Sequence, residues 1–314
     1  MDVAVKYSES LLPIVQVLKV LGLPKSSFYY KPILDSNKSK GRTLSKYTLK
    51  RSGEKVSNNQ VVDDVKKLLG EEFVDYGYLK VTYYLRQELN YIINPKKVYN
   101  LMKINNLLNQ SPIHSSKIRR EWVKELVPRP ELDFSYLEFD IKYFYIHKKR
   151  RNALVLTVID VKSRWILGQF TAWKISEKHV KKLFEEIFNQ YELPEKIYVR
   201  NDNGSQFIAH TIQKYFADKK QPSVIQEFTK PATPEQNAHI ESYHSITERV
   251  ICQKYQFDDL EEFKKTLERF KYFYNFRRIH SGVGYKSPYK YLLEKRIDMD
   301  ADPSQKSFCV PKAS

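Results

Sequence analysis

The chain has 314 residues, 41% of them hydrophobic and 14% aromatic, so it can bury a sizeable core and we expect two or three domains. Its net charge of +17 predicts an acidic partner, and nucleic acid is the commonest partner of a basic soluble protein. The only cysteines, Cys252 and Cys309, exclude a disulfide framework and a Cys-x-x-Cys zinc site, and no run approaches the ~18 apolar residues of a membrane span, so we expect a cytoplasmic protein.

The first 57 residues predict two segments of different character. Residues 1–32 carry an apolar helical pattern from Leu11 to Leu21, a stop at Gly22 and a second short helix from about Ser26. This order predicts a helix-turn-helix-like segment, and a plain helical hairpin without a DNA role fits the pattern equally well. Residues 33–57 are rich in Ser, Lys and Gly, which predicts a flexible basic linker that either follows phosphates or is a solvated tether.

Residues 58–112 predict a helical DNA-binding domain, with helices at 61–69 and 81–89 and a third from Pro95. Asn94 is a favourable N-cap for that third helix, and Pro95 suits its first position. The apolar stripe of the helix faces the core, so its lysines lie on the opposite side, where they contact either phosphate or solvent. The candidate DNA contacts are Lys96, Lys97 and Lys103, together with Arg119 and Arg120 in the basic connector 113–130.

Residues 131–295 change to a strand pattern and predict a mixed α/β sheet covered by helices, with a tail at 296–314. The stretch YLEFDIKYFYI at 136–146 alternates apolar and polar residues, and two further strands at 152–161 and 164–171 follow at intervals short enough for an antiparallel meander. A helix at 177–191 and a strand at 196–200 come next, and we interpret 217–236 as a lengthened loop.

Three acidic residues can converge in this arrangement. Asp140 lies within the first strand, and Asp202 ends the fourth strand, where α/β sheets tend to place their sites. Glu241 lies on a later helix in a polar strip with Asn237, His244 and Glu248, beside a core-facing apolar stripe. The ordinary interpretation of NDNG at 201–204 is a tight turn, and that of Glu241 is a solvent-facing charge.

The motifs FD, NDNGSQF and NAHIES, in this order, resemble the core of DDE transposases and integrases. More closely, the chain resembles the second-frame (OrfB) protein of the insertion-sequence-three family of bacterial transposases, almost from end to end. LGLPKSSFYY is similar to the family's N-terminal motif, and YGYLKVTYYLRQELNYIINPKKVYNLMKINNLL to its helix-turn-helix segment. YNFRRIHSGVGYKSPYKYL is similar to its closing pattern.

The resemblance implies a ribonuclease H-like catalytic core that cleaves DNA at the ends of an insertion sequence and joins the new 3′-hydroxyl to another phosphodiester. It implies two Mg²⁺ (or Mn²⁺) ions, which prefer oxygen ligands, with Asp140 shared and Asp202 and Glu241 each completing one site. The turn at Asn203 and Gly204 would present Asp202. Asn237 would orient substrate or Glu241, or cap the helix. Candidate phosphate contacts near the site are Lys230, Arg249, Arg277 and Arg278.

The implied partners are double-stranded DNA, as terminal repeats and target, further copies of the chain, and an upstream-frame protein joined as a fusion. The implied location is bacterial and nucleoid-associated. Asp160 follows a strand and is an alternative metal ligand, although a turn or buried hydrogen-bonding role is favoured; Glu138 and Glu248 are poorer substitutes. A DNA-binding protein without catalysis and a nuclease of ribonuclease H type are the alternative functions.

Overall fold

The computed structural model describes residues 13–29, 44–109, 128–230 and 234–295, and the chain divides into two compact units, residues 1–45 and 46–314. In the first unit, α2 (Ile14–Val20) and α3 (Lys25–Phe28) are joined through Gly22, whose φ of +65° lies in the left-handed region that favours glycine. Val17 and Leu18 are its buried residues. The two short helices and the glycine stop agree with the sequence pattern.

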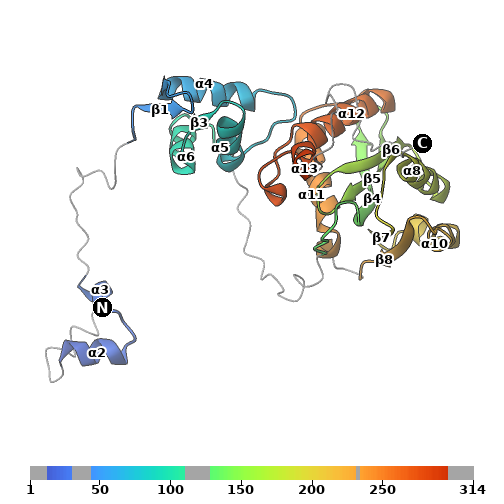
Figure 1. Cartoon of the computed structure of the whole chain (residues 1–314), viewed down its shortest axis with the longest axis horizontal. Helices are drawn as coiled ribbons and strands as arrows, with labels where there is room; N and C mark the ends of the chain where they lie inside the picture. Colours follow the sequence, from blue (N-terminus) through green and yellow to red (C-terminus); the bar gives the residue numbers. More distant parts are fainter. Residues whose placement is uncertain (1–12, 30–43, 110–127, 231–233, 296–314) are drawn as a thin grey trace. The chain divides into compact units, whose positions relative to one another are not determined.

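The second unit begins with a small α+β subdomain (Figure 1). Its three-stranded sheet has the order β2-β1-β3, with β1 at Tyr47–Lys50, β2 at Lys55–Ser57 and β3 at Tyr91–Ile92. The assignment of 47–57 to a flexible linker is therefore wrong, because these residues pair as an antiparallel hairpin through Gly53, which has a φ of +85°. The three expected helices are α4 (Asn58–Leu69), α5 (Tyr78–Gln87) and α6 (Pro95–Ile104).

Side chains cap two of these helices, and the sequence predicts the cap at Asn94. Asn94 Oδ1 accepts a hydrogen bond of 2.8 Å from the Lys96 N–H, and Pro95 occupies the first helical position of α6. Ser57 Oγ accepts from the Gln60 N–H in the same way at the start of α4. The buried faces of α4, α5 and α6 carry the apolar stripes, which leaves polar residues for the surface.

The larger subdomain is built on a five-stranded mixed sheet with the order β6-β5-β4-β7-β8. Strands β4 (Tyr136–Ile146), β5 (Arg151–Asp160) and β6 (Ile166–Ala172) form the predicted antiparallel meander. Strand β7 (Lys196–Asn201) pairs with β4 in parallel, and β8 (Ser223–Phe228) pairs in parallel with β7. This is a ribonuclease H-like sheet, as expected, but β8 corrects the interpretation of 217–236 as a loop.

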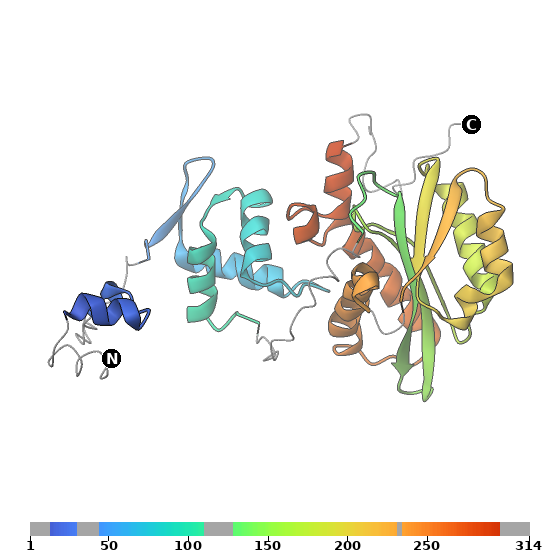
Figure 2. The same cartoon turned by 90° about the horizontal axis from the view of Figure 1, so that it is seen from below.

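Helices cover both faces of the sheet (Figure 2). One face packs on α8 (Glu177–Gln190) and α10 (His210–Ala217), and α9 (Ser205–Ile208) precedes α10. The other face packs on the C-terminal helices. These are η1 (Pro234–Asn237), α11 (Ala238–Thr247), η2 (Glu248–Cys252), α12 (Leu260–Phe276), η3 (Ser281–Val283) and α13 (Pro288–Lys295), of which α13 reaches round to the first face. In the parts of the chain described, no helix is long and apolar enough to cross a membrane.

One side chain in the closing motif protects the sheet edge. Asn275 is 2% exposed; its Oδ1 accepts from the Ile166 N–H at 2.9 Å and its Nδ2 donates to the Ile166 carbonyl at 3.0 Å. The amide therefore takes the place of a further strand on β6, because an edge strand otherwise leaves such backbone groups without partners.

Candidate active site

Strand register places the first two acids at the same level of the sheet. The parallel strands β4 and β7 pair Glu138 with Arg200, so two residues further along each strand bring Asp140 and Asp202 opposite one another. Residues two apart on a strand share a face. Leu137, Phe139 and Ile141 pack with α8 and α10, so the alternate face of β4, with Asp140, is turned towards α11.

The NDNG turn is held from both sides by its asparagines. Asn201 is buried, and its Oδ1 accepts from the Gln226 side chain of β8 at 2.9 Å. Asn203 Nδ2 donates to the Thr229 carbonyl just beyond β8, while Asp202 Oδ1 accepts from the Gly204 N–H at 2.9 Å. Residues 201–204 therefore form a turn, and the hydrogen bonds of Asn201 and Asn203 determine the position of Asp202 between them.

Glycine is required at position 204 for space rather than for a positive φ. Its φ is −59°, which any residue can adopt. A Cβ there would lie 3.0 Å from Asp202 Oδ1 and 3.2 Å from the Phe207 ring, closer than such contacts normally are. The absence of a side chain therefore lets the Asp202 carboxylate fold back over its own turn.

Glu138 anchors the helix that carries the third acid. It is fully buried, and its Oε2 accepts from the N–H groups of His239 and Ile240 at 3.0 and 2.9 Å. The His239 ring Nδ1 lies 2.7 Å from Oε1 of the same carboxyl group. The first N–H groups of a helix have no partner within the helix, so Glu138 supplies that partner and ties the start of α11 to β4. Glu241 follows one residue after this anchor.

The three acids interact electrostatically. Burial, and then the nearby carboxylates of Asp202 and Glu241, raise the pKa of Asp140 to about 7. Within the described ranges, however, no three His, Cys, Asp or Glu side chains are gathered closely enough to hold one metal ion. Asp140 lies on the central strand β4, Asp202 follows the neighbouring strand β7, and Glu241 lies on α11, which contacts β4. Their oxygen donors are those that a hard divalent cation prefers.

His244 is a site residue whose burial beside Asp140 the sequence pattern did not predict. It lies on the predicted polar strip of α11, where it is 4% exposed, and its Nδ1 lies 3.5 Å from Asp140 Oδ2. Burial lowers the pKa of His244 to about 3, so the ring is neutral at physiological pH. Glu241 and His244 are three residues apart and therefore lie on the same face of α11. The part of this face nearest the sheet is buried, and it includes His244.

Asp160 and Asn237 have structural surroundings. Asp160 is fully buried; its Oδ1 accepts from the Phe134 N–H at 3.0 Å and its Oδ2 from the Ser163 N–H at 2.7 Å. This is the buried hydrogen-bonding role that the sequence analysis favoured over metal binding. Asn237 precedes α11 but makes no side-chain cap, and its buried Oδ1 has no hydrogen-bond partner among the described residues. The anchoring role falls to Glu138 instead.

A second, partly buried network holds the segment before α11. Arg200 donates to Glu227 Oε2 at 2.9 Å through Nη2, and to the Gln236 carbonyl at 3.1 Å through Nη1. Tyr136 donates to the same carboxylate oxygen of Glu227. The network joins β4, β7 and β8 to η1, so the chain enters α11 from a fixed point.

The candidate phosphate contacts differ in their surroundings. Lys96, Lys103 and Lys230 are exposed, whereas Lys97 donates to the Tyr47 carbonyl at 2.6 Å. Arg119 and Arg120 lie outside the described residues. Arg249 pairs with Asp75 and Arg277 with Glu71, at 2.5 and 2.7 Å. Arg278 is 1% exposed and pairs with Asp75 at 2.6 Å, so its assignment as a phosphate contact is wrong.

Two kinds of domain are recognised in the sequence. Residues 132–231 match the family model described as the integrase core domain, and residues 223–288 match a second model of the same description. Residues 57–114 match the HTH-like domain. The chain therefore contains an HTH-like domain followed by an integrase core domain.

Two of the curated relatives are proteins of insertion elements, and a third is the putative integrase ORF3 of Spiroplasma virus SpV1-C74, 25% identical over 51% of this chain and 48% of that protein. The transposase for insertion sequence element IS904 of Lactococcus lactis is 30% identical over 147 residues, which are 46% of this chain and 56% of that protein. The insertion element IS476 uncharacterized 39.2 kDa protein of Xanthomonas euvesicatoria is 25% identical over 70% of this chain and 61% of its own length. The chain spans between 48% and 61% of the curated relatives it matches.

Two solved structures are similar at low identity. One is a simian T-cell lymphotropic virus intasome in complex with PP2A regulatory subunit B56 gamma, at 12% identity and a TM-score of 0.45 over 80% of each chain. The other is the HTLV-2 integrase catalytic core domain in complex with magnesium, at 12% identity and a TM-score of 0.40 over 52% of this chain and 99% of that one.

Proposed function

We propose that the chain is a DDE transposase, which cleaves DNA at insertion-sequence ends and joins the 3′-hydroxyl to another phosphodiester. The observation that carries the proposal is the position of Asp140 on β4 beside the parallel strand that leads into Asp202, with α11, the helix of Glu241, packed against β4. Both carboxylates raise the pKa of Asp140. A basic protein has no structural need to bring three carboxylates together, because like charges raise each other's pKa and oppose ionisation.

Asp140 would be shared by two Mg²⁺ or Mn²⁺ ions, and Asp202 and Glu241 would each complete one of the two sites. When bound, the ions favour ionisation of an attacking water or 3′-hydroxyl and stabilise the leaving oxygen of the phosphodiester. The chain's own part is to hold the oxygen donors. Asn201 and Asn203 clamp the turn of Asp202, Glu138 anchors the helix of Glu241, and neutral His244 lies against Asp140.

The partners of this function would be double-stranded terminal repeats and target DNA. Exposed Lys96 and Lys103 lie on the third helix of the HTH-like domain, and Lys230 lies between β8 and η1. Bringing two DNA ends together requires at least two copies of the chain. The resemblance to second-frame proteins of the insertion-sequence-three family implies that the chain also works as a fusion with an upstream-frame protein. Its location would be the bacterial cytoplasm, on the nucleoid.

The test is strand cleavage and joining on a labelled duplex that carries the element's own end, with Mg²⁺ or Mn²⁺. Glu241→Gln removes one proposed ligand, and Glu248→Gln, two helical turns along the same helical segment, is the matched control. We expect nicks with 3′-hydroxyl ends and joined products for wild type and Glu248→Gln, and none for Glu241→Gln. If wild type binds the duplex but neither it nor the upstream-frame fusion cuts it, the chain is a DNA-binding protein without catalysis.

A further inference from the structure

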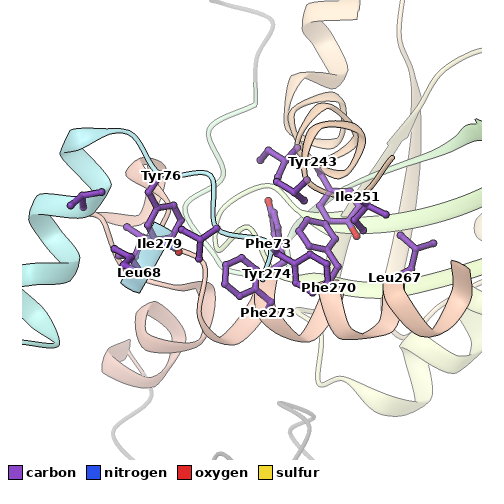
Figure 3. Close-up of a cluster of buried hydrophobic side chains, with 14 of the residues drawn as sticks. Leu68, Phe73, Tyr76, Tyr243, Ile251, Leu267, Phe270, Phe273, Tyr274 and Ile279 are labelled. Atoms are coloured by element: carbon purple, nitrogen blue, oxygen red, sulfur yellow. The ribbon is translucent and has the colours of Figure 1, made fainter. Parts of the chain in front are cut away.

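The segment that joins α4 to α5, residues Glu71–Tyr76, packs into the core of the integrase-type subdomain (Figure 3). Phe73 is 3% exposed, and its ring centroid lies 5.4 Å from that of Phe270 and 5.9 Å from that of Phe273, both on α12. Its φ is +65°, a region that bulky residues rarely adopt. A conformation of this kind persists only where the surrounding contacts hold it.

The same segment carries acids that pair with arginines of the C-terminal helices. Asp75 Oδ1 lies 2.6 Å from Arg278 Nη1. Asp75 Oδ2 accepts hydrogen bonds from Arg249 Nη2 and Nε at 2.5 and 2.9 Å. Burial raises the pKa of Asp75, but these guanidinium groups outweigh it, so the pKa lies below its ordinary value. Tyr76 Oη accepts from the Ile279 N–H at 2.9 Å. The outer pairs are Glu71 with Arg277 and Glu72 with Arg269, at 2.7 and 3.2 Å.

Both sets of contacts lead to the helix that carries Glu241. Phe270 stacks on Tyr243 with ring centroids 5.7 Å apart, and Tyr243 lies on α11 two residues after Glu241. Arg249 lies on η2, which continues α11 without a break. Glu138 anchors the first turn of α11, and β4 and β6 support its sheet-facing side through His244 beside Asp140 and through Tyr243, whose Oη accepts from Gln169 at 2.9 Å. The ring contact of Tyr243 with Phe270 and the pair of Arg249 with Asp75 hold the helical segment from the other side.

We propose that Glu71–Tyr76 positions α11, and with it Glu241, through Phe73 and Asp75. The HTH-like domain then contributes to the candidate active site from within the chain, in addition to any role in DNA binding. Phe73 and Asp75 are positioning residues, since neither touches the three acids. The part of the inference that concerns Glu241 as a ligand rests on the proposed function, whereas the part that concerns α11 does not.

Hydrogen exchange of the full chain tests the position of α11 without reference to activity. Asp75→Asn removes the charge that pairs with Arg249, and Phe73→Leu is a milder second variant that keeps an apolar side chain. Asp63→Asn is the matched control, because Asp63 is an exposed acid on α4 with a 3.9 Å contact to Lys66. We expect exchange at residues 238–252 to be at least tenfold faster in the first two variants. Exchange in β5 should stay unchanged, as should both regions in the control.

Mn²⁺ affinity, measured by titration calorimetry on the same proteins, tests the link to Glu241. We expect a loss of about three- to tenfold for Asp75→Asn and Phe73→Leu, with Asp75→Glu recovering part of it and Asp63→Asn unchanged. Faster exchange that includes β5 equally, or no change at 238–252, overturns the proposal. Selective exchange with undiminished Mn²⁺ affinity also overturns it, because α11 would loosen without moving Glu241. If wild type binds no Mn²⁺, the proposed function fails and the exchange result alone decides the positioning role.

Discussion

Glu138 offers the sharpest test of how the candidate active site is built, because the same carboxyl group could be an anchor or a ligand. Its Oε2 accepts two backbone N–H groups of α11, and the side chain is fully buried. Glu138→Ala would leave the Ile240 N–H without an acceptor in a site that water does not reach. Hydrogen bonds to charged groups contribute about 1.5–3 kcal/mol each, so the loss of these two predicts a loss of about 3–6 kcal/mol in the free energy of unfolding.

Glu138→Gln is the matched variant. Its amide oxygen can accept the same two N–H groups, while its NH₂ faces the His239 ring in place of Oε1. Burial raises the pKa of Glu138 to about 7, so near that pH the carboxyl group is only partly ionised and the neutral amide of nearly the same shape replaces it with a cost within about 1 kcal/mol. Urea unfolding measures both values. Titration with Mn²⁺ should give wild-type affinity for the folded Gln variant, because Glu138 is not among the proposed ligands.

Two results would refute this reasoning. If Gln costs as much as Ala, the negative charge and not the acceptor geometry secures α11. If the Gln variant is folded and stable but loses Mn²⁺ affinity tenfold or more, Glu138 is itself a ligand.

Three further predictions concern buried polar groups. Asp160→Asn turns one of two accepting oxygens into a donor, so we expect a loss of about 2–4 kcal/mol in urea unfolding with unchanged Mn²⁺ affinity; weaker metal binding in the folded variant would make Asp160 a ligand. Asn275→Ala leaves the Ile166 N–H and carbonyl unpaired, and we expect a similar loss; a cost below about 1 kcal/mol would mean that water replaces the amide. Burial lowers the pKa of His280 well below its ordinary 6.5, so below that pH the unfolded chain gains a proton that the folded chain does not, and stability falls as pH falls. His280→Asn should flatten this slope between about pH 6.5 and 5, and equal slopes for the two proteins would contradict the assignment.

The sequence was informative where local rules determine the structure. The alternation in 136–146 predicted β4 and its two faces, and the NP pair at Asn94 predicted the start of α6. Asp140 and Asp202 could be placed near each other because one lies in a strand and the other at a strand end. The sheet and the antiparallel meander follow from patterns of this kind.

The sequence was uninformative where distant segments determine the structure. Strand β8 has mostly partly exposed residues and is defined by its parallel pairing with β7. The 47–57 hairpin is polar and gains its third strand from Tyr91–Ile92. Arg278 appeared to be a surface charge because Asp75, the acid that pairs with it, belongs to another domain of the sequence. The burial of His244 could not be predicted, because a helix face alone does not reveal how much of it the sheet covers.

The features that the sequence did not reveal depend on contacts between distant segments, and such contacts also hold the candidate active site. The carboxylates of Asp202 and Glu241 raise the pKa of Asp140, because like charges repel one another. Other contacts in the fold must therefore hold the three acids in place. Strand register fixes Asp140, side chains bound to β8 and the turn after it fix Asp202, and a buried carboxyl group on β4 fixes the start of the helix of Glu241. Each of these anchors joins segments far apart in the chain. The acids themselves could therefore be found from motifs, whereas what holds them could be found only from the folded structure.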